Sequence, residues 1–321
     1  MEKFYENKTI LVTGGVGSIG SEIVRILLKF NPKAIRILDT NETGLFELEQ
    51  DLKSDKIRTL IGDVRDKERI KLAMNGIDIV FHAAALKHVE LCEYNPFEAV
   101  KTNVNGTQNV IDAAIEENVE MMMIISTDKA VNPISVMGAS KLLAERLTTA
   151  ANLAKGKART VLSAVRFGNV LDSRGSILPI IKNQIRKGGS VTLTDERMTR
   201  FIMSIEDAVM LVLKAASIAQ GGEIFILKMP SVKIKDLIET AIEGTGMKIE
   251  TIGKRPGEKI AEELMTNTEA SCMKELEDMY IVYPEEMCNN GEKEGYGSEN
   301  TKHISKEDIK KILKKIKWEA C

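Results

Sequence analysis

Histidine and cysteine are scarce in this sequence. Its 321 residues include three histidines and four cysteines, and the cysteines are scattered without a CxxC pair or a histidine at metal-ligand spacing. This scarcity argues against a zinc site and against a Ser-His-Asp mechanism. We expect no metal site, and we expect the reduced thiols of a cytoplasmic protein at the four cysteines, Cys92, Cys272, Cys288 and Cys321.

The sequence also lacks a surplus of one charge and a long hydrophobic run. Its 45 basic and 47 acidic residues are interspersed and give a net charge of −2, which excludes the basic field that nucleic-acid binding requires. No apolar run is long enough for a membrane span, and the first residues do not resemble a signal peptide. The one basic cluster, residues 306–318, predicts an amphipathic helix that begins after Ser305 and packs on the body of the protein. A membrane-surface or partner-binding helix is the alternative.

What the sequence does contain is a regular alternation of short apolar runs with amphipathic segments. Continuous apolar strands separated by helices are typical of a parallel sheet that is covered on both faces. The pattern predicts a doubly wound α/β domain. Its six expected strands are residues 9–13, 34–39, 57–63, 77–84, 121–127 and 159–167.

A cluster of glycines stands between the first expected strand and the first expected helix. Residues 15–20 fit G-x-G-x-x-G, in which glycine lets the backbone approach a pyrophosphate held by the N–H groups of the helix start. The motif alone is weak, but its place after a strand and before a helix favours dinucleotide binding over a merely tight turn. We expect cofactor contacts at Gly14, Gly17, Ser18, Ile19 and Gly20.

The ends of the next strands bear on which dinucleotide is bound. Asp39 ends the second strand, 19 residues after Gly20, where a carboxylate accepts hydrogen bonds from ribose hydroxyls and repels a 2′-phosphate. Because residues 40–44 hold no arginine, we favour NAD over NADP. Asp63 and Val64 are expected beside the adenine, although Asp63 also suits a helix N-cap. Small side chains after the fourth strand let the backbone pass close to the cofactor at Ala83, Ala84 and Ala85.

The alternation of strands and helices loosens after residue 168. A helix over 204–219 and a strand over 223–228 are followed by a helix over 233–245 and a strand over 248–252, and the Gly-rich segment 288–300 predicts a loop. We expect a division into two parts. Residues 1–168 and 200–228 would form the NAD-binding Rossmann domain, and residues 169–199 and 229–321 a smaller substrate-binding lobe with the tail helix.

The stretch STDKAVNPISVMGASK, residues 126–141, combines an acid–base pair with a lysine on the next helix. Asp128 and Lys129 follow the fifth strand, at the edge where open α/β sheets bind their ligands. A solvated surface pair is the alternative interpretation. Four residues before Lys141 stands Met137, which can neither donate nor accept a proton.

Several stretches together resemble one family: TGGVGSIG, HAAALKHV, NVNGT, STDKAVNP and VMGASK, with MTRF and RPGEK farther along the chain. They are similar to the extended short-chain dehydrogenase/reductase superfamily and, more narrowly, to its UDP-N-acetylglucosamine 4,6-dehydratase group of polysaccharide biosynthesis. The resemblance covers roughly residues 7–265. It implies a cytoplasmic enzyme that holds NAD, acts on a UDP-sugar and forms homo-oligomers.

The resemblance also implies a reaction and the residues that perform it. Hydride leaves C4 of the hexose, a base removes the C5 proton while an acid helps the C6 hydroxyl leave as water, and hydride returns to C6. By analogy Asp128 protonates the C6 oxygen, Lys129 takes the C5 proton and Thr127 bonds the sugar near O4. Burial and a nearby cation would lower the pKa of Lys129, but the adjacent opposite charges also shift Asp128, so which of the two holds the proton stays open. Lys141 would bind the nicotinamide ribose.

Met137 replaces the tyrosine that removes the O4 proton in ordinary members of the superfamily. Some of these dehydratases themselves carry Met-x-x-x-Lys, so the substitution narrows the family match. The O4 proton would then pass to Asp128 or to a bound water.

The resemblance further implies contacts to a nucleotide diphosphate. Asn169 matches an asparagine that contacts the diphosphate, and a turn-forming role is equally open. Arg200 and Arg255 are candidate phosphate clamps because guanidinium binds phosphate bidentately, although single arginines are usually solvated surface groups. Glu258 would accept hydrogen bonds from the uridine ribose, and Lys87 would face the cleft.

Two other functions remain open. A UDP-sugar 4-epimerase shares everything except the elimination, so it needs no Asp128–Lys129 pair and relies on the tyrosine that is missing here. A non-catalytic nucleotide-binding module is what Met137 alone would suggest, but such a module has no need of Asp128, Lys129 and Lys141 together. The exact sugar, and retention or inversion at C5, also stay open.

Overall fold

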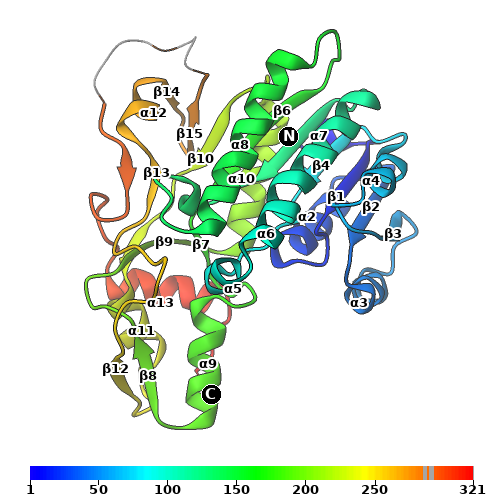
Figure 1. Cartoon of the computed structure of the whole chain (residues 1–321). Coiled ribbons are helices and arrows are strands. Elements are labelled where there is room, and N and C mark those ends of the chain that lie inside the picture. Colours follow the sequence, from blue (N-terminus) through cyan, green and yellow to red (C-terminus); the bar gives the residue numbers. More distant parts are fainter. Residues whose placement is uncertain (285–287, 289–292, 321) are drawn as a thin grey trace.

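A nine-stranded sheet forms the centre of the protein, for which the computed structural model describes residues 1–284, 288 and 293–320. The strand order is β14-β15-β10-β6-β5-β4-β1-β2-β3 (Figure 1). The seven strands from β10 to β3 pair in parallel, which confirms the predicted doubly wound α/β fold. These strands are β1 (Thr9–Thr13), β2 (Ala34–Asp39), β3 (Ile57–Ile61), β4 (Ile79–His82), β5 (Met121–Ile125), β6 (Val161–Arg166) and β10 (Ile224–Leu227).

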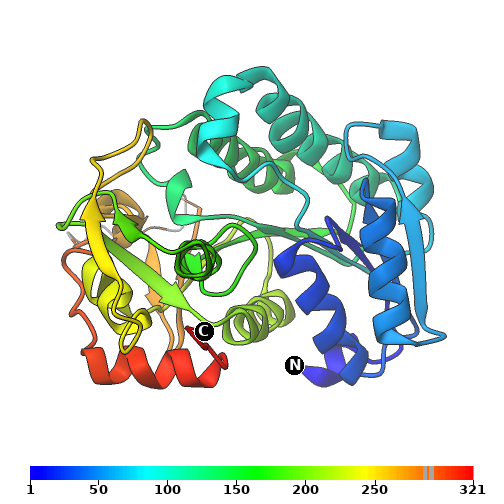
Figure 2. The same cartoon turned by 90° about the horizontal axis from the view of Figure 1, so that it is seen from below.

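Helices cover both faces of this sheet (Figure 2). α2 and α10 pack together on one face, while α4, α7 and α8 lie side by side on the other. Because the strands are buried on both faces, they read as apolar runs; in β5, for example, four of the five residues are buried. The main helices are α2 (Ser18–Lys29), α3 (Glu42–Leu52), α4 (Lys67–Met74), α7 (Gly106–Glu116), α8 (Val136–Ala154) and α10 (Ile205–Ile218).

Short helical segments connect the carboxyl ends of the strands to these helices. A single 3₁₀ turn, η2 (Asp128–Ala130), follows β5, and Thr127 caps it by accepting a hydrogen bond from the Lys129 N–H. This turn fixes the direction of the acid–base pair. Between β4 and α7 lie α5 (Val89–Tyr94), α6 (Pro96–Ala99) and the π-helical η1 (Val100–Asn105), whereas the short α1 (Glu2–Tyr5) precedes β1.

A second hydrophobic core lies below the sheet edge in Figure 1. Two small sheets, β7-β9-β11 and β8-β12, and three helices surround it. The predicted tail helix packs there with Ile309 and Leu313 buried, and Ser305 caps it, which confirms the packed interpretation of the tail. The elements of this lobe are β7 (Asn169–Val170), α9 (Ile177–Lys187), β8 (Ser190–Leu193), β9 (Thr199–Met203), β11 (Ser231–Lys233), α11 (Ile234–Ala241), β12 (Lys248–Thr251) and α13 (Lys306–Lys315).

Between α11 and α13 the chain returns to the large sheet. β15 (Met279–Val282) pairs antiparallel with β10, and β14 (Met273–Glu275) pairs with β15. The sequence interpretation placed these strands in the substrate-binding lobe, whereas their buried side chains join the core of the sheet. β13 (Glu263–Met265), α12 (Asn267–Ser271) and β16 (Tyr296–Gly297) complete this return; β16 lies within the predicted loop 288–300, whose residues 289–292 lie outside the described residues.

A buried ion cluster joins the return segment to the Rossmann core. Arg166, at the end of β6, is 1% exposed and contacts two carboxylates. Its guanidinium lies 2.7 Å from Glu145 of α8 and 2.7 Å from Glu269 of α12. This cluster therefore holds the helix that carries Met137 and Lys141 against the C-terminal third of the chain.

The cysteines differ from the expectation of reduced thiols. Cys272 and Cys288 form a disulfide, so that expectation is wrong for this pair, whereas Cys92 is a buried free thiol. Their approach depends on the fold of α12 and β15, which spacing alone does not reveal. Cys321 lies outside the described residues. Within the part of the chain that the structure describes, no helix is long and apolar enough to cross a bilayer.

Candidate functional site

A cavity of about 610 Å³ opens at the carboxyl ends of β1, β4, β5 and β6. It runs from the glycine-rich turn, past the acid–base pair, to the start of α9. Predicted site residues supply a large share of its wall, which confirms that the sheet edge brings them together. Those that line it are Gly14, Gly17, Ser18, Ile19, Gly20, Ala83, Ala85, Lys87, Thr127, Lys129, Met137, Lys141 and Asn169.

The glycine-rich turn is shaped as a cradle that only glycine fits. Gly14 has φ +65°, and a Cβ placed on it would lie 2.6 Å from the backbone of Ala84. A Cβ on Gly20 would lie 2.3 Å from the Gly14 carbonyl oxygen. α2 begins directly after this turn, and no side chain caps its N-terminal N–H groups. These features fit the pyrophosphate of a dinucleotide.

The Asp39 carboxylate stands at the end of β2 beside this turn. It accepts hydrogen bonds of 3.1 Å from the N–H groups of Val16 and Asn41. Its orientation is therefore fixed by the backbone, as a group that reads the ribose hydroxyls requires.

Asp63, after β3, was expected either beside the adenine or as a helix N-cap, and the structure contradicts the second role. Asp63 accepts hydrogen bonds from the backbone and guanidinium of Arg65, which hold the pKa of its carboxyl below the usual range. The N-cap of α4 is instead Asp66, so the N-cap interpretation of Asp63 is wrong. Val64 is buried and packs under Gly106 of α7.

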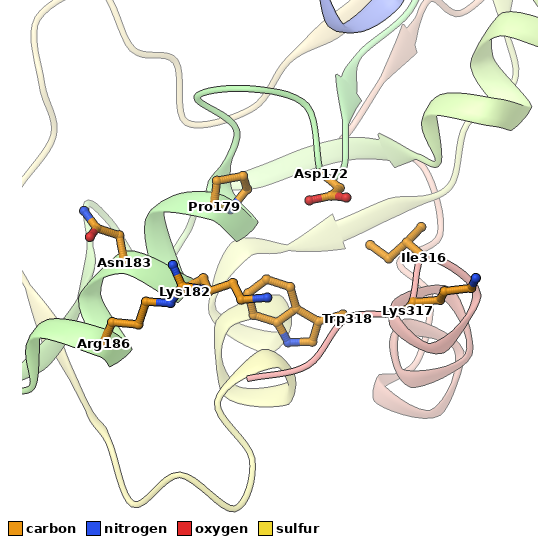
Figure 3. Close-up of a pocket in the computed structure, with 8 residues that line it drawn as sticks. All are labelled: Asp172, Pro179, Lys182, Asn183, Arg186, Ile316, Lys317 and Trp318. Atoms are coloured by element: carbon orange, nitrogen blue, oxygen red, sulfur yellow. The ribbon is translucent and has the colours of Figure 1, made fainter. Parts of the chain in front are cut away.

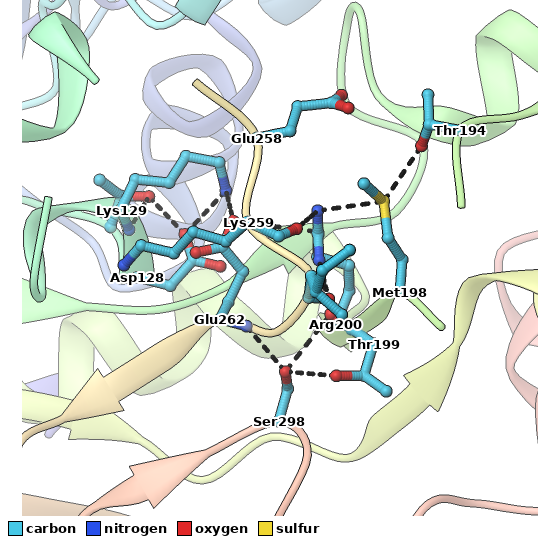
Figure 4. Close-up of polar contacts among 12 residues, drawn as sticks. Asp128, Lys129, Thr194, Met198, Thr199, Arg200, Glu258, Lys259, Glu262 and Ser298 are labelled. Atoms are coloured by element: carbon cyan, nitrogen blue, oxygen red, sulfur yellow. Dashed lines mark hydrogen bonds and ion pairs between the residues drawn. The ribbon is translucent and has the colours of Figure 1, made fainter. Parts of the chain in front are cut away.

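The acid of the acid–base pair, Asp128, is buried, and Figure 4 shows its contact with Lys129. Asp128 is 0% exposed, and its Oδ1 accepts hydrogen bonds from the Thr127 hydroxyl at 2.8 Å and the Lys129 ammonium at 3.0 Å. Its other oxygen, Oδ2, has no hydrogen-bond partner among the described residues. Lys129 reaches the cavity wall, with 27% of its side chain exposed. The alternative of a solvated surface pair is therefore excluded.

A further carboxylate, which the sequence interpretation missed, stands behind this pair. Glu262 is 2% exposed and lies 3.5 Å from the Lys129 ammonium and 3.9 Å from the Arg200 guanidinium. It precedes β13 within the run AEEL, where the neighbouring Glu263 is partly exposed. Adjacent acids alternate between the two sides of a strand, but the sequence does not say which of the two faces inward.

The two carboxylates decide the charge of Lys129. Burial favours its neutral amine, but the negative charges of Asp128 and Glu262 outweigh burial and raise the pKa of Lys129 above its ordinary value. The expected lowering is therefore wrong. Burial, with a contribution from Asp128, also raises the pKa of Glu262.

Lys141 and Met137 share the first turns of α8. Ser135 caps this helix, and a Cβ on Gly138 would lie 2.3 Å from the Lys129 carbonyl oxygen, so α8 lies directly against η2. Lys141 donates a 2.6 Å hydrogen bond to the Ile125 carbonyl, and burial lowers its pKa to about 8. Met137 is 3% exposed at the cavity wall, where it supplies an apolar surface and no proton.

The expected substrate residues fall into two groups. Lys87 and Asn169 line the cavity. Arg200 does not line it: it is 7% exposed and donates hydrogen bonds to the carbonyls of Thr199, Lys259 and Ile260. Its guanidinium therefore holds residues 259–260 against β9, a role that no local pattern reveals.

The RPGEK segment stands at the rim. Arg255 pairs with Glu90 of α5 at 2.8 Å, and the Glu258 carboxylate accepts a hydrogen bond from the Arg255 N–H. Neither residue lines the cavity. Both side chains would have to exchange these contacts to reach a nucleotide.

One more segment of the wall was not anticipated. Residues 173–176 cross from the second lobe to the glycine-rich turn. Arg174 donates a hydrogen bond from its N–H to the Ser18 hydroxyl at 3.0 Å and another from its guanidinium to the Val16 carbonyl. Lys87 donates to the Arg174 carbonyl at 2.6 Å. These contacts tie the two lobes together across the cavity.

A second cavity, of about 320 Å³, shares no lining residue with the first. It lies between α9 and the segment after α13 (Figure 3). Lys182 stands 5.8 Å from the centre of the Trp318 ring, whose N–H donates to the Ala241 carbonyl. This cavity belongs to the packing of the tail on the second lobe.

Sequence comparisons find relatives of several kinds. An uncharacterized membrane protein of Methanocaldococcus jannaschii is 64% identical over 99% of this chain and 98% of its own. A UDP-N-acetylglucosamine 4,6-dehydratase (inverting) of Campylobacter jejuni is 44% identical over 87% of this chain and 84% of its own. A UDP-glucose 4-epimerase of Rickettsia akari is 40% identical over 96% of each chain.

Solved structures share the fold. Pen from Bacillus thuringiensis superimposes with a TM-score of 0.93, at 44% identity over 97% of this chain and 98% of its own. The dTDP-glucose 4,6-dehydratase DesIV from Streptomyces venezuelae, with NAD and TYD bound, gives a TM-score of 0.72 at 22% identity, covering 78% of this chain and 86% of its own. The family model described as polysaccharide biosynthesis protein matches residues 10–284. This chain therefore belongs to the polysaccharide biosynthesis protein family, whose dehydratase and epimerase relatives share its α/β fold.

Proposed function

We propose that the protein is an NAD-dependent UDP-N-acetylglucosamine 4,6-dehydratase, which removes water to give a UDP-4-keto-6-deoxy-N-acetylhexosamine. The observation that carries this proposal is the buried Asp128 carboxylate hydrogen-bonded to Lys129, which lies at the cavity wall. An elimination across C5 and C6 needs an acid and a base side by side. The 44% identity to the Campylobacter jejuni dehydratase supports the same reaction.

The glycine cradle, Asp39 and Lys141 would hold the cofactor. Bound NAD supplies the hydride acceptor for C4 and the hydride donor for C6. Lys141 would bind the nicotinamide ribose, and its positive charge persists below its pKa of about 8. The Asp39 carboxylate would accept from the adenosine ribose hydroxyls and repel a 2′-phosphate, so we favour NAD over NADP.

The protons balance without the missing tyrosine. As C4 is oxidised, the O4–H bond breaks and Asp128 takes that proton on the oxygen that has no partner. Lys129 removes the C5 proton, and Asp128 returns its proton to the C6 oxygen, which leaves as water. Once hydride has reached C6, Lys129 gives a proton back to C5. Met137 would shield these transfers from solvent.

The substrate diphosphate would lie in the same cavity. Lys87 and Asn169 line it and would contact the phosphates. Arg255 would leave Glu90 to bind a phosphate, and this exchange is inexpensive because both side chains of the pair are about half exposed.

A UDP-sugar 4-epimerase is the second candidate, favoured by the 40% identity to the Rickettsia akari enzyme. An epimerase returns hydride to C4 and leaves the C5 hydrogen in place. Epimerisation would therefore not require Asp128 or Lys129. A non-catalytic module would leave Lys141 unused as well.

Proton NMR of UDP-N-acetylglucosamine incubated with the protein and NAD in D₂O tests the proposal. A dehydratase gives a 6-deoxy methyl signal with deuterium at C5, and the C5 couplings distinguish retention from inversion. Formation of UDP-N-acetylgalactosamine without deuterium would establish the epimerase. An unchanged spectrum with bound NAD would overturn the proposal for this sugar.

A further inference from the structure

The Glu262 carboxylate is buried, so it is not one of the solvated acids of the protein surface. It is 2% exposed, its N–H donates a 2.9 Å hydrogen bond to the Ser298 hydroxyl, and its side chain points to Lys129 (Figure 4). Its Oε1 lies 3.5 Å from the Lys129 ammonium, while Oε2 has no hydrogen-bond partner among the described residues. An unpartnered oxygen inside the protein is costly and calls for a role.

Five charged groups meet at this point, and they come from three parts of the chain. Asp128 and Lys129 belong to η2, Arg200 to β9, and Lys259 and Glu262 to the segment before β13. Arg200 and Lys259 are both engaged with backbone carbonyls, Arg200 with those of Lys259 and Ile260 and Lys259 with that of Val131 at 2.6 Å. The proton in question is therefore that of the Lys129 ammonium, which lies 3.5 Å from Glu262.

This contact addresses a difficulty in the proposed reaction. Lys129 must be a neutral amine before it can take the C5 proton, yet the two carboxylates raise its pKa. A proton that moves from Lys129 to Glu262 breaks one N–H bond and forms one O–H bond. The net charge of the cluster does not change, so the transfer creates no new buried charge. Burial favours this neutral pair.

We propose that Glu262 is a positioning residue that accepts the Lys129 proton and so generates the neutral amine needed at C5. This inference rests on the proposed function of Lys129 as a base. Glu262 acts from behind the lysine and does not line the cavity, so it controls the proton without touching the sugar. Asp128 is then free to serve O4 and the C6 oxygen.

The consequence is a lysine whose neutral fraction does not follow the pH of the solution. Internal transfer keeps that fraction constant wherever the Lys129–Glu262 pair holds one proton. For an ordinary lysine at a pH below its pKa, the neutral fraction instead increases about tenfold with each unit by which the pH rises. With Glu262→Gln, Lys129 must lose its proton to solvent and regains the ordinary slope.

Brief labelling with acetic anhydride from pH 6 to 8, quantified at each lysine by mass spectrometry, tests this without turnover. Lys129 is accessible at the cavity wall. We expect its labelling rate to be flat with pH in the wild type, after correction for reagent hydrolysis, and to rise about tenfold per pH unit in Glu262→Gln. Glu263→Gln, which changes the neighbouring and partly exposed acid, should leave the flat profile unchanged.

A wild-type Lys129 profile that rises like those of surface lysines would overturn the assignment, as would a flat profile in Glu262→Gln. Glu262→Asp retains a carboxyl group, and its Lys129 labelling profile should stay flat. This variant provides a second test if Glu262→Gln does not fold. The pH dependence of dehydratase turnover is the second readout, with Glu262→Gln slow at pH 6 and recovering toward pH 8. A flat labelling profile in a protein that does not form the keto sugar would retain the role of Glu262 and reject the proposed function.

Discussion

At the residue scale, the surroundings of a side chain decide the direction in which its pKa is shifted. Lys129 is held as an ammonium by two carboxylates, whereas Lys141 lies in a mostly apolar site with a carbonyl partner. Two lysines 12 positions apart thus have pKa values shifted in opposite directions. In the proposed function the same residue type would therefore serve as a proton carrier at Lys129 and as a cofactor contact at Lys141.

Replacing Lys129 by alanine should abolish dehydration, because the C5 proton then has no acceptor. The glycine cradle is untouched, so the content of bound NAD should equal that of the wild type. Turnover by NMR and nucleotide content by chromatography measure the two effects. Lys157→Ala, in an exposed turn, is the matched control and should keep full activity. Normal turnover in Lys129→Ala would exclude this lysine as the base.

The proposed preference for NAD over NADP rests on Asp39. Asp39→Ala removes the negative charge that would repel a 2′-phosphate and the acceptor for the ribose hydroxyls. The ratio of the dissociation constants for NADP and NAD should therefore fall by about tenfold or more, an estimate based on one charge interaction. Calorimetric titration with each nucleotide measures it, and an unchanged ratio would remove Asp39 from cofactor selection.

Lys141 makes the stability of the protein depend on alkaline pH. Its folded-state pKa of about 8 lies below the ordinary 10.5, because burial favours the neutral amine. Between these pH values Lys141 holds a proton in the unfolded chain but not in the folded chain. The contribution of Lys141 to stability therefore increases as the pH rises from 8 to 10.5. In thermal melts without nucleotide, the melting temperature of the wild type relative to that of Lys141→Met should increase as the pH rises from 8 to 10.5. Parallel melting curves for the two proteins would contradict the shift.

At the scale of elements, the sequence predicts what is local and misses what arises from distant contacts. The strands of the Rossmann core lie within their expected ranges because apolar runs and flanking helices are local features. Asp128, Lys129 and Lys141 were found together because β5, η2 and α8 are consecutive in the chain. Arg200 was misjudged and Glu262 missed because their burial depends on segments about 60 and 130 residues away. The disulfide was missed for the same reason.

Two glycines with similar positive φ angles allow the cost of backbone strain to be separated from the cost of a steric clash in the glycine-rich turn. Gly14→Ala meets both a left-handed φ and the backbone of Ala84, so it should abolish NAD binding. Gly76→Ala meets a similar φ of +68° with no atom within 4 Å, so it should cost only the conformational strain of about 1–2 kcal/mol. Urea unfolding and NAD titration of both variants test this. Equal NAD affinities for the two variants would show that the approach of Ala84 does not matter.

At the scale of the whole molecule, the candidate site takes its residues from both lobes. The cofactor cradle belongs to the large sheet, while Arg200 and the segment that carries Glu262 come from the second lobe and the return segment. The Arg166 ion cluster and the contacts of Arg174 hold these parts in register. The stability of the fold and the geometry of the candidate site therefore depend on the same few polar links.

Arg166 is the link whose loss should be felt most widely. Arg166→Met leaves the carboxylate of Glu145 buried without its charged partner and should lower the free energy of unfolding by about 3–5 kcal/mol. Arg159→Met, at an exposed arginine, should cost less than about 1 kcal/mol. Adding Glu145→Gln to Arg166→Met should restore part of the loss. Urea unfolding measures all three, and an Arg166→Met protein as stable as the Arg159→Met control would show that the ion cluster is not needed.

The pairing of β10 with β6 has a consequence for how the protein is made. While the chain emerges from the ribosome, β6 is complete at Arg166, but its neighbour begins only at Ile224. At about 5–20 residues per second, several seconds pass in which β6 presents unpaired N–H and C=O groups next to an apolar core. An open edge of this kind pairs readily with other nascent chains. This interval is the moment at which the protein most needs a chaperone, and slow translation between residues 167 and 223 would lengthen it.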